Sequence, residues 1–355
     1  MYRMKTICIC GGGSLGHVIA GWLSSRGKAE VRLLTSRPEA FDGTLSVDTP
    51  EVSCHGPEIL EGKLSRWSAD PSEVIPGADI VLLCLPGYMI GKTLEKIGPW
   101  LNPLAFVGSV FSSTGFFIEA QKTLPPSQPL WGFQRVPFIA RVGDYGHSAH
   151  LLGFKKSLSI AVENCSGEGK EEFRTMVQEW FETPAELLSN WYEASLTNSN
   201  PLLHTSRLYT MFGGENDGRK YDHNVLFYEE WTVEAADLLI RMDEEFFRLL
   251  EVLPVRKGYL PRILDYYEST DAVSLAAKLS SIAGFKGITS PMKPVGTRTD
   301  GPVLWEPDFG SRYFTEDFPY GLQLIRGMAH DHGIPVPEID RVCDWGMAHV
   351  SEEKR

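Results

Sequence analysis

The sequence feature that most constrains this chain is a glycine-rich turn close to its start. The apolar run Ile7-Cys-Ile-Cys10 predicts a strand, and glycines at positions 11, 13 and 16 follow it directly. Residues 17–23 then carry apolar side chains at helical spacing. A strand, a turn with the spacing G-x-G-x-x-G and a helix in this order are typical of a dinucleotide-binding domain.

Each glycine of this turn has a physical role. Gly11 permits the tight turn, Gly13 lets the backbone approach a pyrophosphate, and Gly16 lets the helix pack closely on the strand. The helix that starts here presents unpaired N–H groups, which favour a phosphate. The residues expected to bind the dinucleotide at this turn are Gly11, Gly13, Ser14, Leu15 and Gly16.

The end of the second predicted strand, at residues 31–35, bears on the choice of dinucleotide. Asp or Glu at this position usually binds the ribose 2′-OH of NAD, whereas hydroxyls and an arginine suit the 2′-phosphate of NADP. The chain has Thr35, Ser36 and Arg37 here and no acidic residue. We therefore expect these three residues to bind the cofactor and to favour NADP, with NAD as the alternative because some NAD enzymes lack the acid.

Strands and helices continue to alternate through the first half of the chain. The apolar runs at 79–85 and 105–110 predict parallel strands that are covered on both faces, with a helix at 90–97 between them. The first run stops at Leu85 and Pro86, where the carboxyl end of the strand should open onto the cofactor.

The remaining segments of the first half are less regular. Residues 46–75 are expected to add one or two strands, and residues 157–162 and 171–182 a last strand and a helix. The segment 131–153 is too polar for a strand core and too apolar for a linker, so we expect it to lie against the cofactor cleft. The hydroxyls of residues 112–114 either contact the cofactor or substrate or simply form a turn.

From about residue 189 the apolar period changes from that of strands to that of helices. A long amphipathic helix is predicted over 226–253, where Pro254 ends it. Two more helices are predicted over 273–282 and 319–332.

Length and composition fit a division into two domains. The chain has 355 residues, 43% of them hydrophobic, which is enough for an α/β Rossmann-type dinucleotide-binding domain over 1–188 and an all-α C-terminal domain over 189–355. The formal net charge of −12 argues against nucleic acid or an anionic membrane as a partner and favours small-molecule substrates. From residue 191 onward, 26 Asp and Glu stand against 17 Lys and Arg, which indicates either a solvated surface or an attraction for a cationic substrate.

Cysteine usage and hydropathy indicate a cytoplasmic protein. The six cysteines are scattered without a C-x-x-C pair, which favours reduced structural thiols and no metal site. The start has no long apolar stretch with a cleavage site, and no 18 consecutive residues are apolar, so we expect neither secretion nor a membrane span. The oligomeric state stays open, with a homodimer among the options.

Two segments of the second domain carry candidate catalytic groups. Asn200 suits a helix N-cap and Pro201 the first helical position, which places His204 in the first turn. Further along, Arg312 and Asp317 put a basic side chain and a carboxylate five residues apart at a helix start. Position alone leaves plainer alternatives open, namely a structural histidine, an acid that complements the helix dipole and a surface ion pair.

Taken together, these segments resemble the opine dehydrogenases, the octopine/nopaline dehydrogenase family. The resemblance spans most of the chain, and its specific parts are Asn200-Pro-Leu-Leu-His204 and Arg312-x-x-x-x-Asp317 followed by Pro319-Tyr-Gly-Leu322. The glycine-rich turn and Leu85-Pro86 agree with it. The resemblance implies an NAD(P)H-dependent reductive condensation of an α-keto acid, such as pyruvate, with the amino group of an amino acid through an imine, and the reverse oxidation.

The resemblance also implies roles for individual residues. By position, His204 is similar to the family's catalytic histidine, Asp317 to its carboxylate partner, and Arg312 to a residue that binds a substrate carboxylate. Gln134 and Asn200 match segments of the substrate cleft. A histidine suits the implied proton transfers because its ordinary pKa, about 6.5, lies near working pH.

Two other functions stay open at this point. A β-hydroxyacid or ketopantoate-type 2-keto acid reductase shares the architecture but needs no amine, and it usually relies on a lysine, for which Lys286 or Lys293 is available. A dinucleotide-sensing regulator would bind the cofactor without turnover and would not need a histidine, a carboxylate and an arginine in one cleft. Residues 35–37 depart from the family pattern, so the choice between NADP and NAD also stays open.

Overall fold

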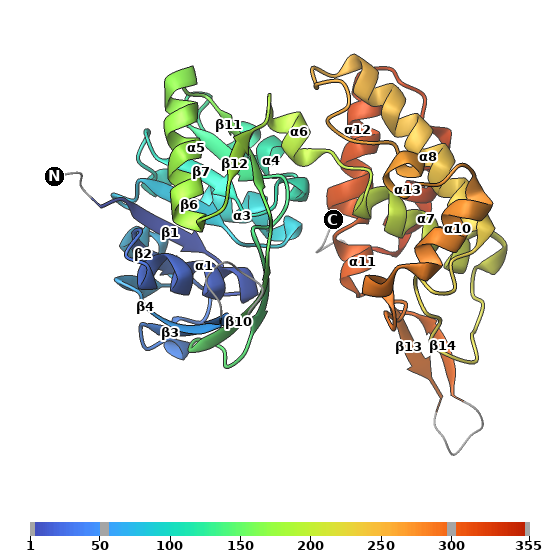
Figure 1. Ribbon diagram of the computed structural model, residues 1–355, viewed down its shortest axis with the longest axis horizontal. Coiled ribbons are helices and arrows are strands. Elements are labelled where there is room, and N and C mark those ends of the chain that lie inside the picture. Colours follow the sequence, from blue (N-terminus) through green and yellow to red (C-terminus); the bar gives the residue numbers. More distant parts are fainter. Residues whose placement is uncertain (1–3, 50–56, 297–302, 352–355) are drawn as a thin grey trace. The chain divides into compact units, whose positions relative to one another are not determined.

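The computed structural model describes residues 4–49, 57–296 and 303–351, and the chain divides into two compact units between Ser195 and Leu196. The sequence placed this boundary between residues 188 and 189. The difference is the short helix α6 (Trp191–Ser195), which packs with the first unit. Figure 1 shows strands and helices in the first unit and mainly helices in the second.

The first unit is built on an eight-stranded sheet in the order β12-β11-β8-β7-β6-β1-β2-β5 (Figure 1). Neighbouring strands are parallel except β8 and β11. This arrangement confirms the predicted Rossmann-type domain. The strands are β1 (Thr6–Cys10), β2 (Glu30–Leu34), β5 (Arg66–Ser68), β6 (Ile80–Leu83), β7 (Phe106–Ser109), β8 (Leu130–Phe133), β11 (Leu158–Glu163) and β12 (Ala185–Leu187).

Helices cover this sheet on both faces, as its continuous apolar strands predict. On β1, Ile7 and Ile9 belong to one buried cluster, and Cys8 and Cys10 belong to the other. The hydrogen bond with Cys8 and burial raise the pKa of the Cys10 thiol, which fits a structural cysteine. The helices are α1 (Ser14–Ser25) and α5 (Gly167–Phe181) on the first face and α3 (Gly87–Ile97) and α4 (Phe116–Thr123) on the second, with the short α2 (Pro71–Val74) after β5.

A second sheet of four strands, in the order β4-β3-β10-β9, packs against α1. Its strands are β3 (Thr44–Thr49), β4 (Glu58–Lys63), β9 (Phe138–Val142) and β10 (Ser148–Phe154). The helix α1 is therefore enclosed between two sheets, and residues 16–23 are all buried. The strands expected within 46–75 are present, apart from residues 50–56, which lie outside the described residues.

Residues 131–153 form strands, which the sequence did not predict. All four residues of β8 are buried in the large sheet, while β9 and β10 alternate buried and exposed positions. Phe138, for example, is buried, whereas Ile139 is half exposed. Strands that pack on one face only have polar residues on the other, and this mixture made the segment look too polar for a sheet.

The second unit is helical, as predicted, with one strand pair added. The helix expected at 273–282 corresponds to α10, and the one expected at 319–332 is a π-helix, η6, that continues into α12. The C-terminal helix α13 was not predicted. The elements are α7 (Asn200–Phe212), α8 (Val233–Val252), α9 (Ile263–Tyr266), α10 (Ala272–Ser281), the antiparallel pair β13 (Met292–Val295) and β14 (Leu304–Pro307), α11 (Arg312–Thr315), η6 (Phe318–Leu322), α12 (Gln323–Asp331) and α13 (Pro337–His349).

The long helix predicted over 226–253 starts later than expected. Helix α8 begins after Thr232, whose side-chain oxygen accepts a hydrogen bond from the N–H of Ala235 at 3.2 Å. Such a cap satisfies one of the four N–H groups that have no partner inside the helix. The prediction was therefore wrong for the turns before this cap.

Residues 225–231 are irregular because their backbone groups bond outside a helix. The N–H of Phe227 donates to the carbonyl of Ile288 at 2.8 Å, and the carbonyl of Phe227 accepts from the guanidinium of Arg207 at 3.2 Å. Phe227 and Trp231 are buried, and their spacing of four residues is the same as that of apolar residues on one face of a helix.

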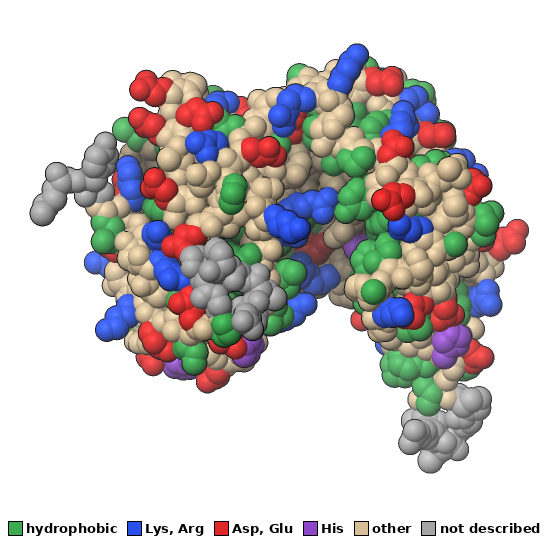
Figure 2. All heavy atoms as spheres, in the orientation of Figure 1, with side chains coloured by type: hydrophobic (Ala, Val, Ile, Leu, Met, Phe, Trp, Pro, Cys, Tyr) green, Lys and Arg blue, Asp and Glu red, His purple; other side chains and the backbone are tan. Residues whose placement is uncertain are grey.

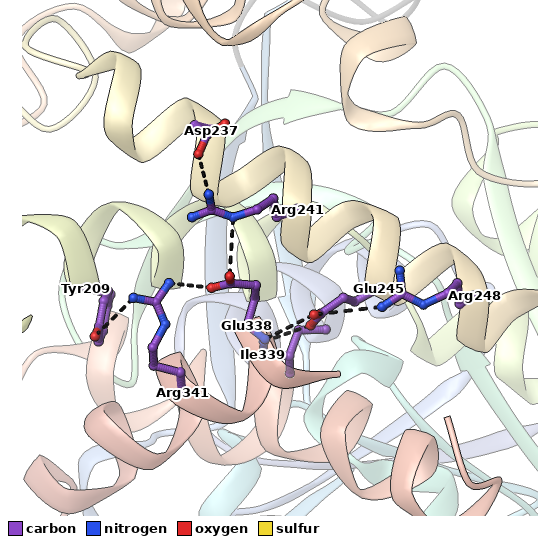
Figure 3. Close-up of polar contacts among 8 residues, drawn as sticks. All are labelled: Tyr209, Asp237, Arg241, Glu245, Arg248, Glu338, Ile339 and Arg341. Atoms are coloured by element: carbon purple, nitrogen blue, oxygen red, sulfur yellow. Dashed lines mark hydrogen bonds and ion pairs between the residues drawn. The ribbon is translucent and has the colours of Figure 1, made fainter. Parts of the chain in front are cut away.

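Helix α13 is held by a buried carboxylate on α8 (Figure 3). The two oxygens of Glu245 accept hydrogen bonds from the N–H groups of Glu338 and Ile339 at 3.0 and 2.9 Å, in the first turn of α13. Burial raises the pKa of Glu245, although these two bonds and Arg248 act in the opposite direction. A negative charge at a helix N-terminus complements the helix dipole, so Glu245 sets where α13 packs.

Charged side chains are scattered over both units on the face drawn in Figure 2. An exposed chain of ion pairs from Asp237 through Arg241 and Glu338 to Arg341 lies next to Glu245 (Figure 3). Among the described residues, none of the helices is long and apolar enough to cross a membrane.

Candidate active site

The glycine-rich turn lies where the large sheet changes its direction of winding. β1 pairs with β2 on one side and with β6 on the other, so the chain leaves this point in opposite directions. Sheets of this type bind ligands outside the carboxyl ends of the strands at such a point. Gly11 follows β1 there, Leu85 and Pro86 follow β6, and a Cβ added to Gly11 would lie 2.9 Å from the Leu85 side chain.

The three glycines differ in what a side chain would meet. Gly11 has a φ of 118°, and its Cβ would lie 2.6 Å from the carbonyl oxygen of Cys84. A Cβ on Gly16 would overlap the carbonyl oxygen of Gly11. A Cβ on Gly13, by contrast, would have no atom within 4 Å. The fold therefore requires Gly11 and Gly16, whereas Gly13 borders open space.

Helix α1 starts at this turn without a side-chain cap, with Gly13 in the N-cap position. The hydroxyl of Ser14 accepts a hydrogen bond from the N–H of Val142 at 3.1 Å, which ties the turn to β9. Leu15 packs against the apolar core. An anion beside Gly13 would satisfy the N–H groups of the first helical turn.

At the end of β2, an arginine side chain stacks on a tyrosine ring. The guanidinium of Arg37 lies 3.6 Å from the centre of the Tyr145 ring, and the Tyr145 hydroxyl lies 3.4 Å from the hydroxyl of Thr35. Thr35 is buried and accepts a hydrogen bond from the N–H of Arg37 at 3.3 Å, while Ser36 and Arg37 are exposed. Sequence analysis did not identify Tyr145, because it lies on the turn between two strands that were not predicted.

His17 connects the glycine-rich turn to the turn between β9 and β10 that carries Tyr145, called the tyrosine turn below. Its Nε2 accepts a hydrogen bond from the N–H of Gly146 at 2.8 Å, so the proton is on Nδ1, which donates to the carbonyl of Gly13 at 3.0 Å. Burial lowers the pKa of His17, which favours the neutral ring that both bonds require. Sequence analysis assigned His17 to the first helix and gave it no other role.

Three further polar groups lie at the carboxyl ends of β7 and β8. The hydroxyls of Ser112 and Ser113, in the short helix η3 (Ser112–Thr114), are buried and have no hydrogen-bond partner among the described residues. Gln134 follows β8, and its side-chain amide donates to the carbonyl of Glu193 at 2.8 Å. Gln134 therefore braces helix α6 as well as being a substrate-cleft candidate.

These features fit a dinucleotide. Gly13 leaves room for a pyrophosphate beside an uncapped helix N-terminus, and Ser112 and Ser113 offer unpaired hydroxyls at the same edge of the sheet. Among the described residues, no three His, Cys, Asp or Glu side chains come together as a metal site would require.

In the second unit, His204 lies near the start of α7. The helix begins one residue earlier than predicted: Ser199 is its N-cap and Asn200 its first residue, so the assignment of Asn200 as N-cap was wrong. Pro201 has the fixed φ and missing N–H that suit the first turn. Asn200 is exposed, and His204 is buried with 8% of its surface accessible.

Both nitrogens of His204 are hydrogen bonded. Nδ1 lies 2.8 Å from a carboxylate oxygen of Asp317, and Nε2 lies 2.9 Å from the hydroxyl of Tyr228. A carboxylate only accepts, so Nδ1 carries the proton and Tyr228 donates to Nε2 of the neutral ring. Asp317 stands at the start of η6, yet its side chain caps no helix. The structure thus brings together His204 and Asp317, which are 113 residues apart in sequence.

Arg312 is the first residue of α11, close to this pair in sequence and exposed. Its guanidinium has no hydrogen bond or ion pair with the described residues. The next side chain, Tyr313, packs its ring 4.7 Å from the His204 ring. Lys286 and Lys293, the lysines of the reductase alternative, are both exposed, and Lys293 pairs with Glu306 on the β13–β14 ribbon.

Comparison with known proteins agrees with this arrangement. The α-helical domain of the NAD/NADP octopine/nopaline dehydrogenases matches residues 187–350. Tauropine dehydrogenase of Arabella iricolor is 29% identical over 99% of this chain and 92% of its own length, and octopine dehydrogenase of Mizuhopecten yessoensis is 25% identical over 98% and 90%. Residues 187–350 thus form the α-helical domain of this family, and the chain is similar to opine dehydrogenases over nearly its whole length.

A solved structure in this family has the same fold. Octopine dehydrogenase with NADH and L-arginine matches 97% of this chain and 89% of its own, with a TM-score of 0.83 at 24% identity. As an opine dehydrogenase, the chain is an NAD(P)-dependent oxidoreductase.

Substitutions at Gly13 and Gly16 should separate cofactor binding from folding in this opine dehydrogenase. Gly13→Ala adds a methyl group to open space, so its melting temperature should stay within about 2 °C of the wild type while NADPH affinity falls about tenfold or more. Gly16→Ala forces α1 away from Gly11 and should cost about 3 kcal/mol of unfolding free energy. Thermal melting and fluorescence titration with NADPH measure both effects. Wild-type affinity in Gly13→Ala would mean that the pyrophosphate does not approach Gly13.

Proposed function

We propose that this chain condenses an α-keto acid with the amino group of an amino acid and reduces the resulting imine with NADPH, and that it also catalyses the reverse oxidation. The observation that carries the proposal is the buried hydrogen bond between His204 and Asp317, five residues beyond an exposed and unpaired Arg312. The dinucleotide turn in the first unit supplies the place for the cofactor.

His204 is proposed as the general acid and base. Condensation requires removal of a proton from the substrate ammonium, and loss of water from the carbinolamine requires return of a proton to its hydroxyl. A neutral imidazole with its lone pair on Nε2 can perform the first step, and the imidazolium so formed can perform the second. When bound, the nicotinamide supplies the hydride that reduces the imine carbon.

Asp317 and Arg312 are proposed to orient the reactants. The carboxylate of Asp317 keeps the proton of His204 on Nδ1 and stabilises the positive charge that forms when Nε2 is protonated. The guanidinium of Arg312 presents two parallel N–H donors that match the carboxylate of a keto acid. Such a bidentate contact fixes the keto carbon for attack by the amine.

The substrates follow from the same chemistry. Pyruvate is the simplest keto acid that offers a carboxylate to Arg312, and the excess of acidic residues after residue 190 makes a basic amino acid the first amine to test. Gln134 and Asn200 are proposed to contact the substrates. The solved octopine dehydrogenase complex with NADH and L-arginine supports this choice of amine.

NADP is proposed as the preferred cofactor. Thr35, Ser36 and Arg37 offer two hydroxyls and a guanidinium at the end of β2, and no carboxylate is among them. Stacking on Tyr145 holds the Arg37 guanidinium beside the strand end. A 2′-phosphate would gain charge-assisted bonds there, whereas a 2′-OH would find no acidic acceptor.

Two more proposals concern the whole protein. The buried, raised-pKa thiols of the first unit suit a reducing compartment, so we place the protein in the cytoplasm. A homodimer is the proposed assembly beyond the monomer.

Oxidation of NADPH should depend on both substrates. With pyruvate and a panel of amino acids, absorbance at the nicotinamide band should fall only when keto acid and amine are both present, because the hydride acceptor is the imine. Arginine and lysine are the first amines to compare with alanine and taurine. A rate with pyruvate alone that no amine increases would contradict the condensation and favour a simple keto acid reductase.

Removal of the His204 imidazole should abolish turnover without loss of cofactor. His204→Ala should reduce kcat by about 10²–10⁴-fold, since general acid and base catalysis contributes that much, while the affinity for NADPH stays within about twofold. The exposed His332 serves as the control, and His332→Ala should keep the wild-type rate. A His204→Ala variant with an undiminished rate would remove this histidine from the mechanism.

Arg37 should discriminate between the two cofactors. Arg37→Ala should raise the KM for NADPH about tenfold or more and leave that for NADH within about twofold, because only NADPH has the 2′-phosphate. Arg66, exposed on β5, gives a matched control. Equal losses for NADPH and NADH would show that Arg37 does not bind the phosphate.

A further inference from the structure

Resting on the proposed function, we propose that Tyr228 relays protons between the substrate and His204, and that Arg207 holds Tyr228 in place for this purpose. Sequence analysis had assigned Tyr228 to a helix and gave it no role. The structure instead places Tyr228 in the turn before α8. Its hydroxyl is hydrogen bonded to Nε2 of His204, the nitrogen that Asp317 does not occupy.

The hydrogen bonds of His204 leave it no free nitrogen. Asp317 occupies Nδ1 at 2.8 Å, and the Tyr228 hydroxyl occupies Nε2 at 2.9 Å. Neutral imidazole has a single lone pair in the ring plane, so a substrate proton cannot reach Nε2 directly while Tyr228 donates to it. Proton exchange therefore passes through the phenol, unless Tyr228 moves away.

The ring of Tyr228 is held against such a movement. It stacks on Phe285 with ring centres 4.0 Å apart and planes 19° apart, and Trp231 lies nearly parallel to it at 5.9 Å. Only 5% of the Tyr228 surface is exposed. Aromatic contacts of this kind hold a ring in one orientation, so the hydroxyl stays directed at His204.

Arg207 fastens the backbone that carries Tyr228. It lies three residues after His204 on α7, and it donates to the carbonyl of Phe227 at 3.2 Å and to that of Glu230 at 2.7 Å. These two carbonyls flank Tyr228 in sequence. Arg207 and His204 thus project from neighbouring turns of one helix, and both hold the same short segment.

The burial of Arg207 needs an explanation beyond stability. Only 3% of its surface is exposed, burial lowers its pKa to about 10, and the structure shows no ion pair for it with the described residues. A buried guanidinium is costly even with hydrogen bonds to two carbonyls and the attraction of the Glu230 carboxylate, and an apolar side chain could fill such a site. The two hydrogen bonds of Arg207 to the carbonyls on either side of Tyr228 explain why a guanidinium occupies this buried site.

The proposed relay balances in both directions. In condensation, the substrate ammonium gives a proton to the phenol oxygen as the phenol proton passes to Nε2, which leaves a free amine, an intact phenol and an imidazolium. In dehydration, the proton on Nε2 returns to the phenol oxygen as the phenol proton passes to the leaving hydroxyl, which departs as water. Burial raises the pKa of Tyr228, so the phenol stays neutral and passes its proton on as it receives another.

Charged and titratable side chains from several segments surround Tyr228. They are Asp317 at the start of η6, Tyr313 on α11, Tyr267 after α9, and Arg207 on α7. A protonated Nε2 donates to the Tyr228 oxygen, and such a bond from a charged donor is stronger than the bond made by the neutral ring. The Tyr228 hydroxyl can therefore accept a proton from the imidazolium as well as donate one to the neutral ring.

Tyr228→Phe tests the relay, because it removes the hydroxyl and keeps the stacked ring. We expect kcat in the NADPH oxidation assay to fall about 10²-fold and the KM for the keto acid to stay within about twofold. Tyr209→Phe is the matched control, because Tyr209 lies on α7, the helix of His204, and its hydroxyl contacts Arg341 on the surface. It should keep the wild-type rate.

The outcomes separate this inference from the proposed function. If His204→Ala loses activity but Tyr228→Phe is as fast as the wild type or faster, the relay is wrong and the phenol merely covers Nε2. If His204→Ala keeps its rate, the proposed function fails instead. Arg207→Lys is a second test that keeps the positive charge but loses the paired donors: kcat should fall about tenfold at unchanged KM, and a wild-type kcat would contradict the holding role of Arg207.

Discussion

The close approach of α1 to β1 is the constraint on which the first unit depends. Gly16 has no room for a side chain because the carbonyl oxygen of Gly11 lies where its Cβ would be. The helix can therefore lie low over the strand, with a sheet on each side of it, and its uncapped N-terminus arrives at the edge where β1 and β6 end. The position proposed for the cofactor thus depends on a backbone contact between Gly11 and Gly16.

In the second unit, the candidate catalytic residues are positioned by polar groups that connect segments far apart in sequence. His204 bonds to Asp317 and Tyr228, and Glu245 and Arg207 bond to backbone groups of α13 and of the turn before α8. Each of these side chains is largely buried, and each satisfies groups that would otherwise lack a partner. In this unit, the buried polar bonds that position the helices also orient the histidine.

The parts of this structure that follow a local rule could be predicted from sequence. The glycine-rich turn, the central strands and α10 have the expected spacing, and the family resemblance drew attention to His204 and Asp317. What could not be predicted depends on partners distant in sequence. The segment around Tyr228 was predicted to be helical because Phe227 and Trp231 have the spacing of an apolar helix face. Its backbone instead forms hydrogen bonds with Ile288 and Arg207. The strands β9 and β10 lacked a continuous apolar run because they pack on one face only and expose polar residues on the other.

The neutral bridge made by His17 has a consequence for evolution and for protein engineering. One imidazole holds Gly13 with one nitrogen and Gly146 with the other, and the neighbouring Tyr145 supports Arg37. A single ring thus connects the glycine-rich turn with the turn that carries Tyr145, and these are the two proposed ends of the dinucleotide site. If Arg37 and Gly13 bind the cofactor as proposed, a substitution that changes cofactor preference at the strand end also disturbs the glycine-rich turn, so lineages that switch cofactors should alter the histidine and the tyrosine turn together.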